Sequence, residues 1–196
     1  MAIAERELAP QARKQFYTED EYLVREEAAE ERSEYVNGEL QPMSGGTDDH
    51  ALISGNVSAE LRAILRRGDC RVYGSDLKIY GDGAMRYPDV SVVRGPRIYH
   101  GANRTVVCNP LLIAEVLSPS TEKTDRGAKF RNYSAISTLQ VYLLISQNTP
   151  RVEMYLRGEN ENWDYSEIVG LDAALSIPTL SVSLPLSEIY DLIEFD

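Results

Sequence analysis

The sequence is poor in cysteine, and it has neither a secretion signal nor a long apolar run. Its two cysteines, Cys70 and Cys108, have the spacing of neither a metal site nor a disulfide framework. We therefore expect both to be reduced, inert core thiols in a cytoplasmic protein. The N-terminus lacks the basic start and apolar stretch of a signal peptide. No apolar run approaches the roughly 18 residues that a membrane span needs, which predicts a soluble protein without a membrane partner.

Basic residues are also scarce. The 20 Lys and Arg are outnumbered by 31 Asp and Glu, so the net charge is −11 and the pI is about 4.7. This balance argues against tight, nonspecific binding of nucleic acid, because such binding depends on cations that neutralise phosphates. The acid is concentrated, however: eight of the sixteen residues from Glu19 to Glu34 are acidic. Bound divalent cations would also reverse the local field around an acidic cleft.

The remaining composition is that of an ordinary globular protein. With 196 residues, 43% of them apolar and 26% charged, the chain has the size and content of one domain with its own core. We assign residues 17–196 to this single domain. We expect residues 1–16 to be a flexible or partner-bound tail.

The first third of the chain carries clear signals for local structure. Thr18 and Glu21 form a capping-box pattern, which predicts a helix from there to about Glu31. The Asn37-Gly38 pair suits the two positive φ values of a type I′ turn and predicts a hairpin over 33–40. A second helix, which ends near Gly68, is predicted from apolar residues that recur on one helical face: Ile53, Val57, Leu61, Ile64 and Leu65.

The rest of the chain predicts a sheet. Strands are expected at about 70–80, 87–93, 110–117, 139–145 and 151–157 and around Trp163, with a helix at about 121–136 and a short final helix after Ser187. The strands at 110–117 and 139–145 are almost wholly apolar and are joined by that helix, which predicts a parallel, right-handed crossover covered on both faces. The earlier strands are expected to be antiparallel. The fold class is therefore α/β (α+β), a mixed sheet flanked by helices with an αβββαβ core.

Glu115 is the most informative residue, because it lies in the middle of the apolar run Leu111–Leu117. An ionised carboxylate in a buried strand costs several kcal/mol unless a cation or hydrogen-bond donors meet it. Asp89 lies near the start of the strand before it. Two carboxylates on neighbouring strands can hold Mg²⁺ or Mn²⁺, and the backbone carbonyl of Val116 would add a further oxygen ligand. Such a metal would activate and orient a water molecule. Lys129 would position or deprotonate that water, or neutralise the phosphate in the transition state.

These residues form a pattern that resembles a known superfamily. Pro88-Asp89, the run Glu115–Thr121, and Asp125 followed by Lys129–Tyr133 are similar to the PD-(D/E)XK nucleases. More closely, they resemble the bacterial branch of small restriction-endonuclease-like proteins, the Uma-type endonuclease family. The likeness also takes in Glu34–Leu40, His50 and Leu184–Tyr190, and so covers nearly the whole chain. It implies a restriction-endonuclease-like fold and a metal-dependent activity on DNA.

One departure from the superfamily pattern concerns the lysine. The superfamily places it two residues after the glutamate, where this chain has Leu117. The resembling branch uses a lysine on the following helix, which here matches Lys129. Lys123 is the rival, one turn closer to the loop. Asp125 lies four residues before Lys129, so a solvated surface ion pair between the two is the alternative reading.

Further residues are weaker candidates. Glu34, beside the Asn-Gly turn, is either a surface strand residue or a contact to a metal-bound water. His50 is interpreted as a helix-start residue rather than a base. Asp76 is a similarly weak candidate for the site. For Glu115, a purely structural ion pair with Arg126 or Lys129 is the alternative. The candidate site therefore comprises Asp89, Glu115 and Lys129, with Val116 as a metal ligand, and the accessory residues Glu34, His50, Asp76, Lys123 and Asp125.

The sequence favours a Mg²⁺- or Mn²⁺-dependent endonuclease-like hydrolase of DNA phosphodiester bonds. A non-catalytic binding or regulatory domain and a metal-dependent hydrolase of small phosphate esters are the alternatives. Cutting both strands needs two active sites, so a homodimer is expected. DNA binding should be weak without metal and should depend on a local patch; the candidates are Arg62, Arg66, Arg67, Arg71, Lys123, Arg126, Lys129 and Arg131.

Overall fold

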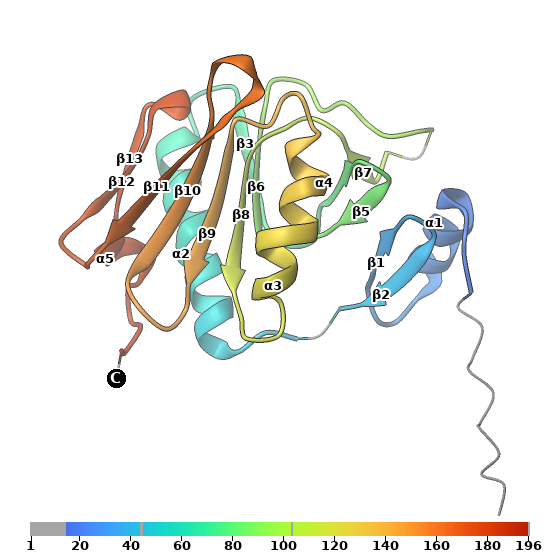
Figure 1. Cartoon of the computed structure of the whole chain (residues 1–196), viewed down its shortest axis with the longest axis horizontal. Coiled ribbons are helices and arrows are strands. Elements are labelled where there is room, and N and C mark those ends of the chain that lie inside the picture. The colour runs from blue at the N-terminus through green and yellow to red at the C-terminus, as the bar shows by residue number, and fades with distance from the viewer. Residues whose placement is uncertain (1–14, 44, 103, 196) are drawn as a thin grey trace, which may run out of the picture. The chain divides into compact units, whose positions relative to one another are not determined.

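The structure is a computed structural model that describes residues 15–43, 45–102 and 104–195 (Figure 1). The chain divides into two compact units, Met1–Met43 and Ser44–Asp196. Most of the predicted tail, residues 1–14, lies outside the described residues. The assignment of residues 17–196 to one domain stays a prediction.

The first unit begins with helix α1 (Glu19–Ala28). Its capping box is confirmed: Glu21 N–H donates to the Thr18 hydroxyl at 3.2 Å, and Thr18 N–H donates to the Glu21 carboxylate at 2.8 Å. The helix ends at Ala28, three residues earlier than the predicted end at Glu31. The next residue, Ala29, is extended with ψ of 142°, which stops the helix.

A hairpin of β1 (Ser33–Val36) and β2 (Glu39–Pro42) follows, as predicted. Asn37 and Gly38 have φ values of 49° and 95°, the left-handed backbone that a type I′ turn requires. Tyr22 of α1 stacks on Tyr35 of β1 with 5.4 Å between ring centroids. The Tyr22 hydroxyl donates to the Ser33 carbonyl at 2.7 Å, so helix and hairpin pack on each other.

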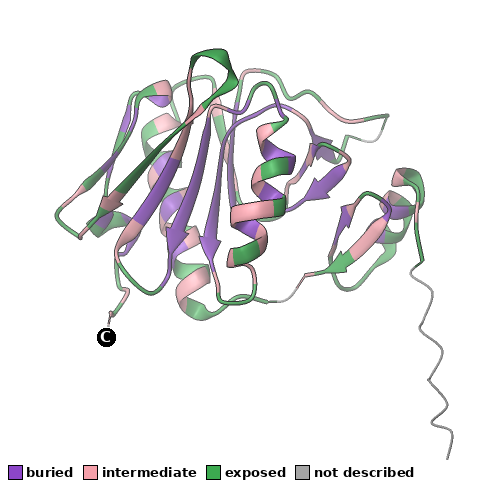
Figure 2. Cartoon of the chain, in the orientation of Figure 1, coloured by how far each residue is buried: buried purple, intermediate pink, exposed green. Residues whose placement is uncertain are grey.

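The second unit is built on a six-stranded sheet with strand order β11-β10-β9-β8-β6-β3. The strands are β3 (Cys70–Tyr73), β6 (Val90–Arg94), β8 (Pro110–Leu117), β9 (Val141–Ser146), β10 (Arg151–Arg157) and β11 (Trp163–Val169). The predicted parallel pairing of β8 with β9 is confirmed, and the other neighbours are antiparallel. In Figure 2 the central strands are almost wholly buried.

Helices cover both faces of this sheet (Figure 1). On one face lie α2 (Asp48–Leu65), α5 (Leu186–Ile189) and the hairpin of β12 (Ala174–Ile177) and β13 (Val182–Pro185). The other face carries the crossover helix and three short strands, β4 (Lys78–Gly81), β5 (Ala84–Arg86) and β7 (Val106–Val107). Short 3-10 turns lie at Glu159–Glu161 and Pro178–Leu180. The predicted mixed sheet flanked by helices is therefore confirmed.

Several strands differ from the prediction. The single strand expected at 70–80 is two strands, β3 and β4, which belong to different sheets and are separated by a turn. β4 and β5 form a hairpin through Asp82 and Gly83, whose φ values are 46° and 71°. Asp-Gly is a recognised hairpin signal that the sequence interpretation did not use. β7, β12 and β13 were not predicted, since strands of two to four residues carry little periodicity.

The crossover helix is not one regular helix. It consists of α3 (Glu122–Thr124), a π-helical turn (Asp125–Lys129) and α4 (Phe130–Ser134). A π turn inserts one extra residue into the helix and frequently occurs at functional sites. This irregularity falls on the segment that carries the predicted Asp125 and Lys129.

The two cysteines are both free and half-buried, not fully buried core thiols as expected. Burial raises the pKa of the Cys108 thiol, which disfavours the reactive thiolate. Among the described residues, no helix has both the length and the apolarity needed to cross a membrane.

Candidate active site

The side chain of Glu115 is fixed by the alternation of β8. Leu112, Ala114 and Val116 join the core on the α2 side, so Ile113, Glu115 and Leu117 face the crossover helix. Glu115 is 1% exposed, which confirms that its carboxylate is buried. A buried carboxylate at this position needs partners, and the crossover helix supplies them.

Asp89 lies directly before β6, opposite Glu115. The register pairs Val90 with Ala114, so the next positions outward along the two antiparallel strands are Asp89 and Glu115. Asp89 accepts a hydrogen bond from the Val116 amide at 2.7 Å. The two carboxylates therefore stand at the same edge of the sheet, as predicted. The Val116 amide is used in this contact, and a ligand role for its carbonyl stays a prediction.

His50 also reaches this edge. It lies in the first turn of α2, where its amide donates to the hydroxyl of the N-cap Thr47 at 3.1 Å. Its Nε2 is 3.2 Å from Asp89 Oδ2. The hydrogen bond to Asp89 raises the pKa of the His50 imidazole, against the opposing effect of burial. His50 is thus a helix-start residue, as interpreted, and in addition a direct partner of Asp89.

Lys129 is the cation that meets Glu115. Its ammonium is 3.1 Å from Glu115 Oε2 and 2.9 Å from Asp125 Oδ1. Asp125 is 1% exposed and Lys129 is 9% exposed, so the solvated surface pair considered from the sequence is wrong. Within the described residues, Asp125 Oδ2 has no hydrogen-bond partner. The π turn thus brings a lysine and a second buried carboxylate to Glu115.

Two tyrosines complete the cluster. The Tyr133 hydroxyl donates to Glu115 Oε1 at 3.1 Å, and the Tyr142 hydroxyl donates to the Asp125 carbonyl at 3.0 Å. Burial, and secondarily the charges of Glu115 and Asp125, raises the pKa of the Tyr142 phenol well above its ordinary value. Tyr142 therefore remains a neutral hydrogen-bond donor that holds the π turn against β9.

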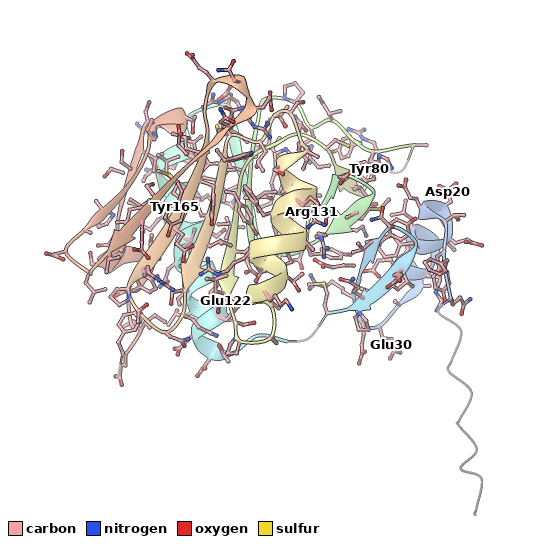
Figure 3. All side chains as sticks on the ribbon, viewed as in Figure 1. Asp20, Glu30, Tyr80, Glu122, Arg131 and Tyr165 are labelled. Carbon is pink, nitrogen blue, oxygen red and sulfur yellow. The ribbon has the colours of Figure 1, made fainter. Side chains whose placement is uncertain are left out.

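Two other sequence candidates of the second unit, Lys123 and Asp76, do not join this cluster. Lys123, the rival lysine, is exposed on α3, and Asp76 is exposed in the turn between β3 and β4. Glu34 is a buried residue of β1 in the first unit, opposite Gln41, so its predicted role near the metal stays a prediction. Arg126 contacts Glu122 of α3, which is labelled in Figure 3, and Glu153 of β10 rather than Glu115.

Two residues of this region were missed from the sequence. Tyr133 lies four positions after Lys129, which is the helical spacing that places two side chains on one face. Gln147 is buried directly after β9, and its amide oxygen accepts from the Thr47 hydroxyl at 2.8 Å. The sequence could have pointed to Gln147 through its position directly after the carboxyl end of a parallel strand, where ligand-contacting residues commonly lie.

The fold and this edge of the sheet define a restriction-endonuclease-like protein. A crystal structure described as a putative nuclease of the DUF820 family from Anabaena variabilis shares the fold, with a TM-score of 0.73 and 18% sequence identity. The similarity covers 89% of this chain and 98% of that chain.

By sequence, the chain belongs to the Uma2 family, which is described as a putative restriction endonuclease family and whose model matches residues 19–187. Two proteins of Synechocystis, both described as uncharacterized, are similar over most of their length. Protein slr1290 is 36% identical over 173 residues, which cover 87% of this chain and 90% of that protein. Protein sll1609 is 34% identical over 167 residues, which cover 84% and 94%. The resemblance inferred from the sequence is confirmed.

Proposed function

We propose that the protein is a Mg²⁺- or Mn²⁺-dependent endonuclease that hydrolyses DNA phosphodiester bonds. The observation that carries the proposal is the position of Lys129, whose ammonium contacts Glu115 beside Asp89 at one edge of the sheet. This is the set of groups that metal-assisted phosphodiester hydrolysis requires, in a chain of a restriction-endonuclease family.

The residues present fit a hard divalent cation. Asp89 and Glu115 supply carboxylate oxygens from facing positions. Within the described residues, His50 and the Val116 amide both contact Oδ2 of Asp89, so neither of them uses Oδ1. The described residues contain no group of three or more His, Cys, Asp or Glu side chains arranged to hold a metal. Two carboxylates suit Mg²⁺ or Mn²⁺, which take oxygen ligands and keep several waters. Such a cation, when bound, lowers the pKa of water and stabilises negative charge on phosphate oxygens.

Lys129 has two roles in this proposal. In the described structure its ammonium contacts the carboxylates of Glu115 and Asp125 and offsets their mutual repulsion in a buried place. During hydrolysis it orients the attacking water and offsets the negative charge that accumulates on the phosphate. Asp125 keeps the ammonium at this position, because the ion pair between the two residues is buried and its N–O distance is only 2.9 Å.

His50 and the Val116 amide fix the orientation of Asp89. Both contact the same oxygen, Oδ2, at 3.2 Å and 2.7 Å, so the carboxylate cannot rotate freely. Tyr133 does the same for Glu115. The two carboxylates are thus held in place before any cation or substrate binds, which lowers the entropic cost of reaching a productive geometry.

Two observations favour two competing hypotheses about the function. The chain has Leu117 where the superfamily pattern has lysine, and its net charge is −11. Both suit a binding or regulatory domain that has the nuclease fold but no activity. The acidic charge also suits a hydrolase of small phosphate esters, which needs no long basic surface.

A substrate panel distinguishes the three hypotheses. Supercoiled plasmid, bis(p-nitrophenyl) phosphate and a set of nucleotides are incubated with the protein in Mg²⁺, Mn²⁺ or EDTA, alongside Lys129→Ala. The proposal predicts plasmid nicking that requires metal and is lost in Lys129→Ala. Hydrolysis of nucleotides without nicking supports the small-ester alternative. No hydrolysis of any substrate, with metal-dependent plasmid binding, supports the binding domain.

The metal itself is tested by thermal melts. The two carboxylates should favour Mn²⁺ binding to the folded state, by about 2.7 kcal/mol at a hundredfold excess over the dissociation constant. Asp89→Ala should abolish most of the Mn²⁺-induced rise in Tm relative to EDTA. An equal rise in the variant means that the metal binds elsewhere.

A further inference from the structure

Strand β11 forms one edge of the six-stranded sheet and pairs only with β10. Within the described residues, no backbone group of β11 is hydrogen-bonded to any segment other than β10. In Figure 2, β11 is coloured mostly as exposed, in contrast to the buried central strands. The outer side of β11 is therefore a row of unpaired N–H and C=O groups, which is a template for pairing with another strand.

The two edges of the sheet differ in how they are protected. The opposite edge strand, β3, has only four residues and contains Arg71. β11 has seven residues, contains no Lys, Arg or Pro, and pairs with β10 without a bulge. Short length, charged side chains, proline and bulges are the features by which natural proteins avoid edge-to-edge association. Of these features, β11 has only two acidic side chains, Asp164 and Glu167.

Large apolar side chains are exposed along the same strand. Tyr165 is 55% exposed and Val169 is 59% exposed. Both lie with Trp163 on the face that carries the crossover helix, because side chains alternate along a strand and Ile168 packs on the opposite core. Tyr165, labelled in Figure 3, packs on Tyr155 of β10 with 5.3 Å between ring centroids. An apolar stripe thus continues from β10 to the edge.

The directions of the unpaired backbone groups follow from the ladder with β10. At one end of this ladder, the Gly158 N–H donates to the Asn162 carbonyl at 2.8 Å. At the other end, the Gly170 N–H donates to the Pro150 carbonyl at 2.8 Å. Hydrogen-bonded pairs alternate with non-hydrogen-bonded pairs along an antiparallel ladder. Counted from either end, the N–H and C=O groups that point away from β10 belong to alternate residues: Trp163, Tyr165, Glu167 and Val169.

These outward-directed groups are self-complementary about Ser166. A two-fold axis normal to the sheet makes two copies of β11 antiparallel and keeps each side chain on its own face. With the axis at Ser166, Tyr165 of one copy lies opposite Glu167 of the other. In the same register, Trp163 lies opposite Val169. Every outward-directed N–H and C=O group of the strand then has a partner.

Other registers are less favourable. Because directly paired residues must share a face of the sheet, the axis can pass only through a residue. An axis at Glu167 places this carboxylate opposite its own copy, and like charges directly opposite each other are destabilising. An axis at Tyr165 leaves Val169 outside the paired region. The register centred on Ser166 places no acidic residue opposite another, so charge and length select the same register.

We propose that β11 pairs with β11 of a second copy of the chain around a two-fold axis at Ser166. The two six-stranded sheets then form one continuous sheet, and its remaining edges are the short β3 strands of the two copies. Trp163 and Val169, an aromatic and a β-branched residue, form a favourable cross-strand pair at each end of the interface. This interface goes beyond the proposed nuclease activity and does not rest on it, so it is tested without metal or DNA.

Proline at position 167 tests the pairing. The Glu167 N–H points away from β10, so Glu167→Pro removes no hydrogen bond of the ladder with β10. Light scattering at micromolar concentration should give twice the chain mass of 22.0 kDa for the wild type and for the control Glu167→Gln, and one chain mass for Glu167→Pro. Circular dichroism checks that each variant is folded. A folded Glu167→Pro variant that remains dimeric would overturn the proposal. A monomeric wild type would overturn it in favour of a strand from another protein.

A pair of cysteine variants tests the register and does not depend on the folding of the proline variant. In the proposed dimer, Ser166 lies opposite its own copy in a non-hydrogen-bonded pair, where Cα atoms are about 4.5 Å apart and a disulfide can form. Asp164→Cys is the control, because Asp164 is equally exposed on the same face but lies opposite Ile168. Both variants retain Cys70 and Cys108, so the background reaction is shared. Under mild oxidation, covalent dimers should form at least tenfold faster in Ser166→Cys than in Asp164→Cys. Equal rates, or no covalent dimer, would overturn the proposal.

Discussion

At the scale of single residues, one glutamate in an apolar strand accounts for most of what the sequence predicts about the site. Asp89 and Glu115 were predicted because carboxylates are costly on buried strands, and the structure brings them to one edge. The choice between Lys129 and Lys123 could not be made from spacing alone, because it depends on the helical phase. The π turn changes that phase. Tyr133 and Gln147 escaped prediction because tyrosine and glutamine occur commonly outside functional sites.

Glu115→Gln should separate stability from activity. The glutamine keeps the volume and still accepts from Tyr133, while Lys129 keeps Asp125 as its counterion. We therefore expect a loss of about 1–2 kcal/mol in the free energy of unfolding, less than the 3–5 kcal/mol for a fully uncompensated buried charge. Cleavage should be abolished. Urea denaturation and a nicking assay measure the two quantities. A loss above about 4 kcal/mol would indicate a structural ion pair.

Lys129→Met should have a larger effect on stability, because it leaves Glu115 and Asp125 buried without their shared cation. We expect the free energy of unfolding to fall by about 3–5 kcal/mol without metal, together with loss of cleavage. Lys123→Met is the control, since Lys123 is exposed and its replacement should change stability by less than about 0.5 kcal/mol. Urea denaturation of both variants checks the expectation. Comparable effects of the two substitutions would contradict the assignment of Lys129.

At the scale of elements, the crossover between β8 and β9 was predictable, but the shape of its helix was not. Two apolar strands joined by a helix of about that length must be parallel, and they are. The π turn over Asp125–Lys129 depends instead on tertiary contacts, such as the hydrogen bond from Tyr142 to the Asp125 carbonyl. Short strands such as β7 are likewise defined by pairing with a neighbour, which no local pattern reveals.

Arg126 attaches the crossover helix to the sheet, and this contact predicts a pH dependence. Its guanidinium donates two hydrogen bonds to Glu153 of β10, at 2.5 Å and 2.8 Å, and these lower the pKa of the buried Glu153 carboxyl. A carboxyl with a lowered folded-state pKa contributes stability above its ordinary pKa, 4.5, and loses it as the pH falls through the folded value.

We therefore expect Glu153→Gln to be less stable than the wild type by an amount that is constant between about pH 6 and pH 8 and shrinks below pH 4.5. Urea denaturation at several pH values measures this difference. Glu167→Gln is the control, because Glu167 lies opposite Glu153 on β11 and its side chain is 40% exposed, against 5% for Glu153. A difference that persists unchanged at pH 3 would mean that packing, not the ion pair, is responsible.

At the scale of the whole molecule, the net charge of −11 averages an acidic and a basic part of the chain. The family and the fold were predictable because their motifs are distributed over most of the length. The expected metal, DNA substrate and second subunit stay predictions, because each depends on contacts with another molecule.

Assembly is a prediction at this scale. An enzyme that cuts both strands of a duplex needs two active sites, and a two-fold homodimer is the simplest way to provide them. Light scattering at micromolar concentration should give twice the chain mass of 22.0 kDa. A mass of one chain under those conditions would contradict the dimer, though not the hydrolytic site.

The central claim is that Asp89, Glu115 and Lys129 act together in metal-dependent DNA hydrolysis. Its most direct test is the rate at which supercoiled plasmid is nicked in Mg²⁺ by the wild type, Asp89→Asn, Glu115→Gln and Lys129→Met, with EDTA as the blank. The account predicts nicking by the wild type alone, abolished by EDTA, and a rate at least a hundredfold lower in each folded variant, as for loss of an essential catalytic group. Nicking that persists in Glu115→Gln, or that is unaffected by EDTA, would contradict it.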